Sequence, residues 1–376
     1  MRRPVSLAWL ALTSLACSQL LGIDDLAWRG GDASVDAPVD AELDDVAEDA
    51  PLDAATCDGS FAADPKNCGR CGHDCFGGAC DAGACEPATL LAQSGLEATL
   101  ATDGEQVFFR VGGAVDACSV TGCASPTTLW TASAATPRLV AASAGRVYWN
   151  DGNAVYGCDA AAPCGTPATM FDLGASQLTG LAASAASSWV LGAGYTASTL
   201  RVMRAKTDAS TSDQVVSMSI GGSTSGAVTA VPQSSHVYWG EEGAPAIFDC
   251  VSPPCTTYDH DTTALGSSPL AMVATIASVF FGTTGGLWTV DASLANAKAF
   301  AGSGTVALVV LAPSSESTVY FVSQAAGTWT LASCPTAACP SPATLRATTT
   351  PITALAADDV SLYFIEGGAI ERLALP

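Results

Sequence analysis

A pair of large apolar side chains, usually aromatic, recurs about every 40 residues through most of this 376-residue chain. Counted at the first aromatic residue of each unit, the steps are 40, 41, 49, 42, 40 and 43 residues. The seven units are Val107-Phe108-Phe109, Val147-Tyr148-Trp149, Ser188-Trp189-Val190, Val237-Tyr238-Trp239, Val279-Phe280-Phe281, Val319-Tyr320-Phe321 and Leu362-Tyr363-Phe364. A fixed period of this length, built from short strands, is typical of β-propeller blades. The sequence therefore predicts an all-β, seven-bladed propeller over residues 86–376.

Each unit has the parts of a four-stranded blade. A strand of small residues, such as 139–142, precedes the aromatic pair, and third and fourth strands follow it. The fourth strands in three units begin with similar segments, at Ser125, Thr166 and Ser341. The last unit ends after its third strand, whereas a segment of the same type, 86–91, stands before the first unit. This segment is predicted to supply the missing strand and close the ring.

Eight cysteines fall within the repeats as four close pairs, each bracketing the turn between a third and a fourth strand. The pairs are Cys118–Cys123, Cys158–Cys164, Cys250–Cys255 and Cys334–Cys339. Cysteines across such a turn have the reach of a disulfide, so we expect four structural disulfides. Redox-active pairs are the less favoured interpretation.

A second group of cysteines precedes the repeats, in residues 57–85. It comprises Cys57, Cys68, Cys71, Cys75, Cys80 and Cys85. Six cysteines in so short a segment predict a small module held by three disulfides of unknown pairing. A CxxC followed by His73 and Cys75 leaves zinc or iron–sulfur binding as the alternative.

Two resemblances accompany these patterns. The run Asp64-Pro-Lys-Asn-Cys68-Gly-Arg-Cys71-Gly resembles the stigma-specific cysteine-rich family, a type of module also found in predicted lipoproteins of myxobacteria. The aromatic repeats resemble YWTD-type propeller repeats, which implies the propeller fold. Neither resemblance implies a particular chemistry, because propellers host many functions.

The N-terminus has the features of a secretory signal. Two arginines precede a short apolar run and the segment Ser14-Leu15-Ala16-Cys17, so residues 1–16 are predicted to be a signal peptide. Cys17 resembles the lipid-modified cysteine of bacterial lipoproteins, although Leu15 and Ser14 depart from the usual lipobox. The two cysteine groups account for 14 of the 15 cysteines and leave Cys17. We expect an exported protein anchored by lipid to an outer membrane or cell surface; plain secretion is the alternative.

The segment that follows Cys17 is rich in aspartate and alanine. Residues 24–56 contain eleven carboxylates and one arginine, without hydrophobic periodicity. Such a segment buries too little apolar surface to fold, and its charges repel one another. We therefore predict that residues 17–56 are a lipid-anchored start followed by a disordered acidic linker. Calcium binding is the weaker alternative, since the spacing of an EF-hand is missing.

The charge balance and the motif search exclude several classes of function. The net charge is −22, so phosphate backbones are repelled and no nucleic-acid partner is expected. The sequence has no nucleophile elbow, P-loop or HExxH motif, and its three histidines lack metal-ligand spacing. We expect no catalytic residue, cofactor or metal.

The remaining candidates lie in the loops after the second strands, which share one face with the connections between blades. They are Arg110, Asn150, Asp151, Glu241, Glu242 and Glu366. Such a face could bind a cation, a sugar or a basic partner, but turns require these residue types anyway. An insertion rich in Gly, Ser and Thr, 208–226, is predicted to be a flexible lip over one face.

These observations favour a non-enzymatic lipoprotein of the cell envelope, whose propeller is an extracytoplasmic platform for an unknown protein or carbohydrate. The alternative is a propeller enzyme that acts on glycans or peptides at the cell surface. Clustered carboxylates at the mouth of the ring favour the enzyme, and carboxylates spread around the rim favour the platform. A purely structural envelope component is the third interpretation, for which we expect no deep pocket.

Overall fold

The computed structural model describes residues 61–132, 139–174, 176–184, 188–196, 199–219, 231–233, 236–241, 246–251, 253–255, 259–261, 267–313 and 316–375. The chain divides into two compact units, Met1–Thr56 and Cys57–Pro376, and the described residues all belong to the second. The predicted signal peptide, Cys17, the acidic linker and Cys57 lie outside the described residues. Within the described part of the chain, no helix has the length and apolar character needed to span a bilayer.

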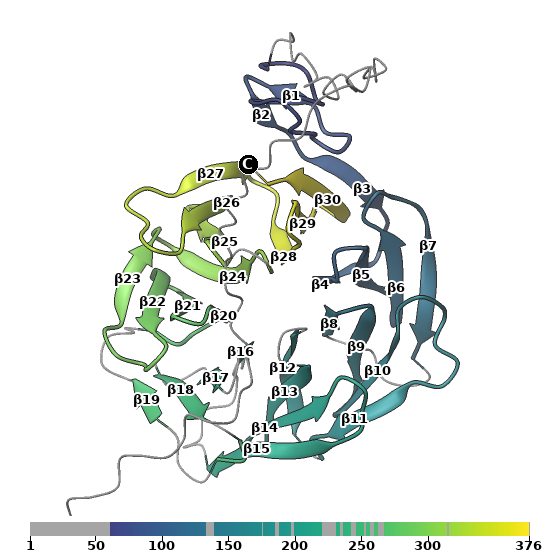
Figure 1. Cartoon of the computed structure of the whole chain (residues 1–376), viewed down its shortest axis with the longest axis vertical. Coiled ribbons are helices and arrows are strands. Elements are labelled where there is room, and N and C mark those ends of the chain that lie inside the picture. The colour runs from purple at the N-terminus through teal and green to yellow at the C-terminus, as the bar shows by residue number, and fades with distance from the viewer. Residues whose placement is uncertain are drawn as a thin grey trace, which may run out of the picture. The chain divides into compact units, whose positions relative to one another are not determined.

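The described strands after the cysteine-rich segment form seven four-stranded antiparallel sheets, numbered here in chain order (Figure 1). Sheet 1 comprises β4 (Leu96–Thr102), β5 (Gln106–Val111), β6 (Ala114–Ser119) and β7 (Gly122–Thr131). Sheet 2 comprises β8 (Val140–Ser143), β9 (Arg146–Asp151), β10 (Ala154–Asp159) and β11 (Ala168–Asp172). Sheet 3 comprises β12 (Gln177–Ser184), β13 (Trp189–Tyr195), β14 (Thr199–Lys206) and β15 (Ser212–Ser219).

The other four sheets repeat this order. Sheet 4 comprises β16 (Val231–Gln233), β17 (His236–Glu241), β18 (Ala246–Val251) and β19 (Asp259–Asp261). Sheet 5 comprises β20 (Ala271–Ala274), β21 (Ser278–Thr283), β22 (Gly286–Asp291) and β23 (Lys298–Ala301). Sheet 6 comprises β24 (Thr305–Leu311), β25 (Thr318–Ala325), β26 (Thr328–Pro335) and β27 (Ala343–Thr348). Sheet 7 comprises β28 (Ile352–Ala357), β29 (Ser361–Glu366), β30 (Ala369–Ala374) and β3 (Ala88–Ala92).

The sheets stand around a common axis with their first strands innermost (Figure 1). Each first strand contacts the first strand of the next sheet, and β28 contacts β4 in turn. The contacts therefore close a ring, and the prediction of an all-β propeller is confirmed.

The aromatic pairs explain why neighbouring sheets pack together. Successive residues of a strand point to opposite faces of its sheet, so one aromatic faces the next sheet and the other faces the preceding sheet. In β5, Phe108 packs in the cluster between sheets 1 and 2, and Phe109 packs in the cluster between sheets 7 and 1. In β9, Tyr148 packs toward sheet 3 and Trp149 toward sheet 1. All four side chains are fully buried.

The third repeat has a different register from the one the sequence suggests. Strand pairing aligns Leu191 and Gly192, rather than Trp189 and Val190, with the aromatic positions of β9. A Cβ atom on Gly192 would lie 2.6 Å from a ring carbon of Phe171, which fills the space of the missing aromatic side chain. The prediction that Trp189 belongs to this pair is therefore wrong, because a residue of the neighbouring sheet replaces it in the core.

The insertion after the third strand of this repeat also differs from expectation. Residues Ser212–Ser219 form β15, the fourth strand of sheet 3, and pair with β14 along its length. Val215 and Val216 are buried between sheets 3 and 4. The prediction of a flexible lip is therefore wrong for this stretch, because two valines within the otherwise polar segment are buried in the core.

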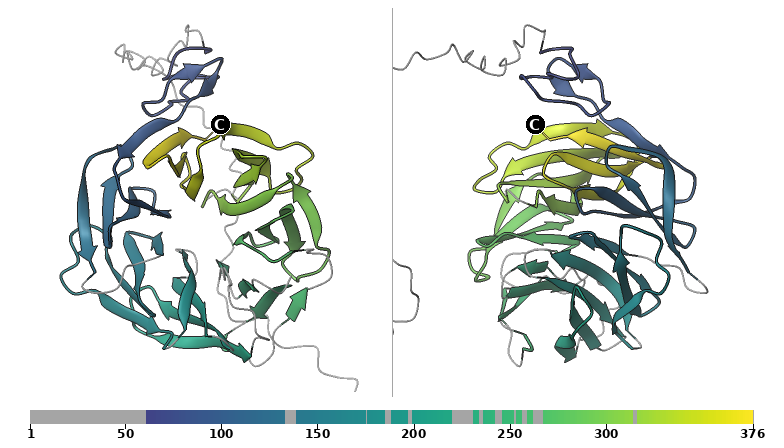
Figure 2. Two further views of the ribbon diagram at one scale, coloured as in Figure 1. Left: turned by 180° about the vertical axis from the view of Figure 1, so that it is seen from behind. Right: turned by 45° about the vertical axis from the view of Figure 1, so that its right-hand side comes forward.

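The N-terminal strand of the repeat region completes the last sheet. β3 pairs antiparallel with β30, with Thr89 opposite Glu371, and Thr89 Oγ1 donates a hydrogen bond to Glu371 Oε1 at 2.9 Å. Both views in Figure 2 show β3 beside this sheet, close to the C-terminus. The prediction that the segment before the first repeat supplies the missing fourth strand is confirmed.

The cysteine-rich segment forms a small module with one short hairpin, β1 (Cys80–Asp81) and β2 (Ala84–Cys85). Disulfides Cys68–Cys80 and Cys75–Cys85 hold it together, and Cys71 is also disulfide-bonded. The module contacts sheet 7: a ring nitrogen of His73 lies 2.9 Å from the carbonyl oxygen of Leu375. The guanidinium of Arg372 lies 3.9 Å above the ring of Phe76.

Disulfides also close the turns after four of the third strands. The structure contains Cys118–Cys123, Cys158–Cys164, Cys250–Cys255 and Cys334–Cys339, with Cα–Cα distances between 5.2 and 6.0 Å. Because disulfides persist in oxidising compartments, their number indicates an exported or extracellular protein.

Candidate functional site

The antiparallel order of the strands gives the ring two distinct faces. The turns after the first and third strands open on one face, which also carries the four disulfide-closed turns and is called the disulfide face here. The turns after the second strands and the links between sheets open on the other, the connection face. The ligand-binding candidates from the sequence that the structure describes belong to the connection face.

Asn150 and Asp151 end β9 on the connection face and shape the turn there. Asn150 is only 2% exposed, and its Oδ1 accepts a hydrogen bond from the backbone N–H of Leu139 at 2.9 Å. Its Nδ2 donates to the carbonyl of Gly152 at 3.0 Å. Partial burial raises the pKa of the Asp151 carboxyl. Asn150 therefore ties the turn of sheet 2 to the start of its first strand.

Arg110 is also buried, at 2% exposure, and its Nη2 lies 2.6 Å from Oε2 of Glu97 on β4. A buried guanidinium that pairs with a carboxylate of its own sheet contributes to structure rather than to the surface. Glu242 lies outside the described residues, and so does the side chain of Glu241, although its backbone ends β17.

Glu366 lines a polar hollow of about 380 Å³ with Glu86, Arg346 and Glu371. Its Oε1 accepts a hydrogen bond from Thr348 Oγ1 at 2.7 Å, and its Oε2 lies 3.4 Å from Nε of Arg346. Arg346 also lies 3.6 Å from Glu86, just before β3. The arginine therefore links sheets 6 and 7 to the segment that leads into the closing strand.

A larger cavity, of about 600 Å³, lies on the ring axis and reaches the disulfide face. Residues of six first strands and of the turns after them line it: β4, β8, β12, β20, β24 and β28. Nine alanines line it, and its larger aliphatic side chains are Leu100, Leu181, Met272, Val273, Val310, Leu311 and Leu355. Lysine, arginine and histidine are absent from the described residues that line it. The cavity therefore combines apolar walls with negative charge.

The negative charge comes from four carboxylates of the turns that surround the cavity. They are Asp103 of sheet 1, Glu316 in the turn between β24 and β25 of sheet 6, and Asp358 and Asp359 of sheet 7. The Oδ1 atom of Asp103 accepts hydrogen bonds from the backbone N–H groups of Glu105 at 3.0 Å and Gln106 at 2.8 Å. These carboxylates come from three neighbouring sheets, 6, 7 and 1, and two of them are adjacent residues of one turn.

Asp358 is the most deeply buried of the four, at 4% exposure. Its Oδ1 accepts hydrogen bonds from the backbone N–H groups of Val360 at 2.8 Å and Ser361 at 2.7 Å. Its Oδ2 accepts the hydroxyl hydrogen of Tyr363 at 2.7 Å. Burial and the nearby Asp358 carboxylate raise the pKa of Tyr363, so the phenol keeps the proton that it donates.

Sequence reasoning looked for polar loop residues and therefore selected the connection face, whereas the axial cavity reaches the disulfide face. The cavity is lined mainly by the small-residue first strands, whose composition the sequence does show. Their convergence on one axis depends on contacts between residues up to about 250 positions apart, such as those of β28 with β4.

A histidine–aspartate pair on sheet 4 is a second polar feature that the sequence did not suggest. His236 Nδ1 lies 2.9 Å from Oδ2 of Asp249, which is buried. The imidazole also stacks on Tyr238, with ring centroids 5.6 Å apart. A carboxylate in this position fixes the orientation of the imidazole ring. The other histidine of the repeats, His260, has a side chain outside the described residues.

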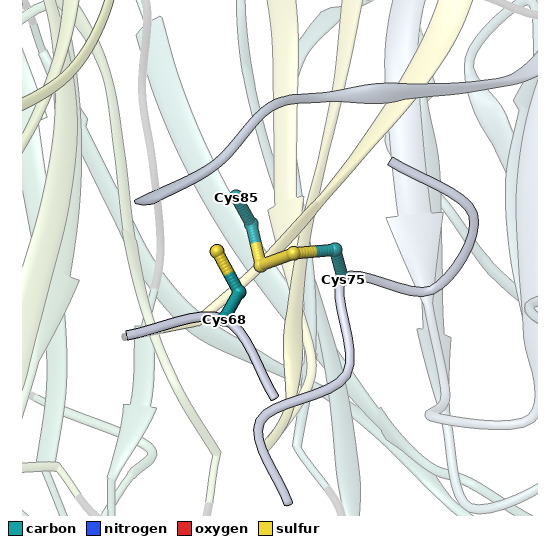
Figure 3. A group of neighbouring side chains, drawn as sticks. All are labelled: Cys68, Cys75 and Cys85. Atoms are coloured by element: carbon teal, nitrogen blue, oxygen red, sulfur yellow. A yellow bond between two sulfur atoms is a disulfide. The ribbon is translucent and has the colours of Figure 1, made fainter. Parts of the chain in front are cut away.

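The cysteine-rich module brings three sulfur atoms close together. The Sγ atoms of Cys68, Cys75 and Cys85 lie within 4.8 Å of one another (Figure 3). All three belong to disulfides, two of them to the same one. Since a metal ligand must be a thiolate, these cysteines bind no metal while they are oxidised.

Comparisons with known proteins identify the fold. No protein-family model matches the chain, and no curated protein matches it. Many solved structures are similar to it, and three of them illustrate the likeness over about three quarters of the chain. A chain of the mitotic checkpoint complex has 10% identity and a TM-score of 0.61, covering 77% of this chain and 94% of that chain. Virginiamycin B lyase from Staphylococcus aureus has 11% identity and a TM-score of 0.60, covering 77% and 99%.

The third is the WD40 β-propeller domain of Doa1, with 13% identity and a TM-score of 0.58, covering 76% of this chain and 95% of that chain. One of these structures is a lyase and another is a WD40 domain. At such low identity the likeness shows the propeller fold alone.

Proposed function

We propose that this protein is an exported lipoprotein anchored through Cys17, whose seven-bladed propeller binds a ligand in the axial cavity without chemical change. The acidic linker then holds the propeller away from the membrane. The cavity on the disulfide face is the observation that carries the binding function. A volume of about 600 Å³ is within the range of known ligand sites.

The walls of the cavity suit recognition. Each first strand is an edge of its sheet, so every second residue directs its backbone N–H and C=O groups toward the axis rather than toward a partner strand. The small side chains leave this backbone accessible. A ligand in the cavity can therefore bury apolar surface and pair with backbone donors and acceptors together.

The carboxylates at the rim support binding over catalysis. Asp103 and Asp358 accept hydrogen bonds from backbone N–H groups of their own turns. Carboxylates that make such hydrogen bonds fix the conformation of the turns around the opening of the cavity. The cavity also weighs against a purely structural envelope component, for which we expected no deep pocket.

A propeller enzyme acting on glycans or peptides is the alternative, and the His236–Asp249 pair is the observation that favours it. A histidine oriented by a buried carboxylate has the arrangement of a general base. In that case the reaction takes place near sheet 4 on the disulfide face.

One experiment separates binding from turnover. The full mature chain is incubated with peptidoglycan fragments and with a tryptic peptide mixture, and retained and free molecules are compared by mass spectrometry over time. We expect some species to be retained with unchanged mass. Retention should be lost in Ala182→Phe, which places a large side chain at a half-buried wall residue outside the apolar clusters.

Ala161→Phe is the matched control, because Ala161 is exposed on the disulfide face and away from the axis. It should retain the same species as the unmodified protein. Retention that is equal in both variants contradicts binding in the cavity. New masses that accumulate with time, and that disappear in His236→Gln, establish the enzyme instead.

The anchor is tested separately by intact-mass spectrometry of the protein from bacterial envelopes. We expect a diacyl- or triacylglyceryl adduct at an N-terminal Cys17. We also expect a gain of 14 hydrogens on reduction, because 15 cysteines less Cys17 leave 14 for seven disulfides. Cys17→Ser should move the protein into the soluble fraction. An unlipidated mature protein contradicts the anchor.

A further inference from the structure

Two strongly exposed apolar side chains stand beside the axial cavity. Ile276 is 75% exposed in the turn between β20 and β21, and Val360 is 51% exposed in the turn between β28 and β29. Both turns open on the disulfide face. Pro313, which lines the cavity and is exposed, belongs to the corresponding turn of sheet 6, between them. These three residues, called the apolar arc here, cover three consecutive sheets.

Carboxylates that line the cavity hold the arc in place. The backbone N–H of Ile276 donates to Oε2 of Glu316 at 3.3 Å, across two neighbouring turns. The backbone N–H of Val360 donates to Oδ1 of Asp358 at 2.8 Å. These hydrogen bonds restrain the turns that carry Ile276 and Val360. Because the turns are already ordered, less conformational entropy is lost when a partner covers the two side chains.

The charge on the described lining of the cavity beside the arc has a single sign. Asp103, Glu316, Asp358 and Asp359 line the cavity, and the described lining residues include no cation. The arginine beside the arc is Arg372 of sheet 7, which is buried and whose Nε donates a hydrogen bond to Oγ of Ser361, next to Val360, at 2.9 Å. The chain as a whole carries a net charge of −22. The negative charge therefore favours a positively charged partner. It attracts such a partner toward the protein, and it pairs with the partner's cations at the rim of the cavity.

We propose that the apolar arc and the axial cavity form a docking site for a cationic peptide segment, in which one apolar side chain enters the cavity between flanking basic residues. The basic residues then face Asp359 and Glu316, and the peptide backbone covers Ile276 and Val360. The inference rests on the binding function proposed above and names the class of its ligand.

Isothermal titration calorimetry of the full mature chain with three short synthetic peptides tests the proposal. The peptides are Lys-Lys-Leu-Lys-Lys, the same peptide with serine in place of leucine, and Glu-Glu-Leu-Glu-Glu. We expect binding of the first, at least tenfold weaker binding of the second, and none of the third. The double variant Ile276→Ser with Val360→Ser should weaken binding of the first peptide at least tenfold, and Asp359→Asn should weaken it several-fold.

Val251→Ser is the matched control. Val251 is also an exposed apolar residue, at 53%, on the same face, but it ends the third strand of sheet 4 away from the cavity. Circular dichroism and thermal unfolding establish that each variant is folded. Binding unchanged by the control but weakened by the double variant supports the docking site.

The proposal is overturned if the leucine and serine peptides bind equally well, or if all protein variants bind the first peptide equally. Either result indicates non-specific electrostatic attraction. Absence of binding also overturns it. The binding function itself is then judged by the Ala182→Phe retention experiment, whose outcome does not depend on the charge of the ligand.

Discussion

At the scale of single residues, close approaches between sheets decide which side chains fit. Gly282 on β21 lies against the backbone of β24 in the next sheet, and a Cβ atom there would collide with the carbonyl oxygen of Val306. Backbone atoms of a neighbouring strand move less easily than the end of a side chain. The sequence contains many glycines, and only the packing of sheets 5 and 6 shows why this one is required.

Gly282→Ala is therefore expected to lower the free energy of unfolding by about 2 kcal/mol or more, through overpacking. The measurement is urea unfolding followed by tryptophan fluorescence. Gly122→Ala serves as the control, because no heavy atom lies within 4 Å of a Cβ at that position. It should change stability by less than about 0.5 kcal/mol. Equal effects of the two substitutions contradict the packing explanation.

A buried phenol on sheet 4 sets a second expectation at this scale. Burial, together with the carboxylates of Asp249 and Asp291, raises the pKa of Tyr238 to about 12 from an ordinary value of 10.0. The fold therefore favours the protonated phenol. The resulting stability is fully present below about pH 10 and is lost as the pH rises from about 10 to about 12.

Tyr238→Phe should consequently lose less stability than the unmodified protein over that range, although it lacks the hydrogen bond from the hydroxyl to the carbonyl of Ala292. Unfolding free energies measured at several pH values test this, with phenolate absorbance as a second measurement. Parallel pH curves for the two proteins argue against the raised pKa.

At the scale of the strand pair, the disulfides fasten the outer half of a sheet. Cys118 and Cys123 close a turn of only a few residues, so the bond restricts a short loop of the unfolded chain. The spacing also explains why the sequence alone could pair these cysteines. Within a hairpin, few other partners lie within reach.

Replacing Cys118 and Cys123 with serine is expected to lower the free energy of unfolding by about 2 kcal/mol, the chain-entropy value for so short a loop. Thermal and urea unfolding of the double variant check it, with Thr121→Ser in the same turn as the control. A double variant as stable as the control contradicts a stabilising role for this bond.

At the scale of the whole molecule, the closing strand is the least local element of the ring. β3 pairs with β30, almost 280 residues later, and Leu90 and Leu91 pack against the cluster between sheets 7 and 1. Without β3, sheet 7 has three strands and β30 becomes an open edge. Such an edge pairs readily with another chain.

A chain that begins at Gln93 should therefore unfold at a lower temperature and self-associate. A chain that begins at Pro87, which keeps β3 but lacks the cysteine-rich module, should remain a monomer. Light scattering after size exclusion and thermal unfolding distinguish the two. A monomeric and equally stable chain without β3 contradicts its role in closing the ring.

The sequence by itself determined the features that local spacing encodes. The 40-residue period predicted the propeller, the short cysteine spacings predicted the disulfides of the turns, and the segment before the first repeat predicted the closing strand. Local spacing was misleading in the third repeat. Phe171 of the neighbouring sheet fills the space left by Gly192, so Trp189, the aromatic residue nearest to the expected position, is not part of the repeated pair.

Only the tertiary structure decided where a cavity of about 600 Å³ forms. Arg110, Asn150 and Glu366 are the polar loop residues that the sequence favours, and each is engaged in holding the fold. The axial cavity instead forms where small-residue strands from distant repeats converge. Its rim joins Asp103 to Asp358, which are far apart in the chain. A single repeat contains no information about such a site, because the cavity exists only once the ring has closed.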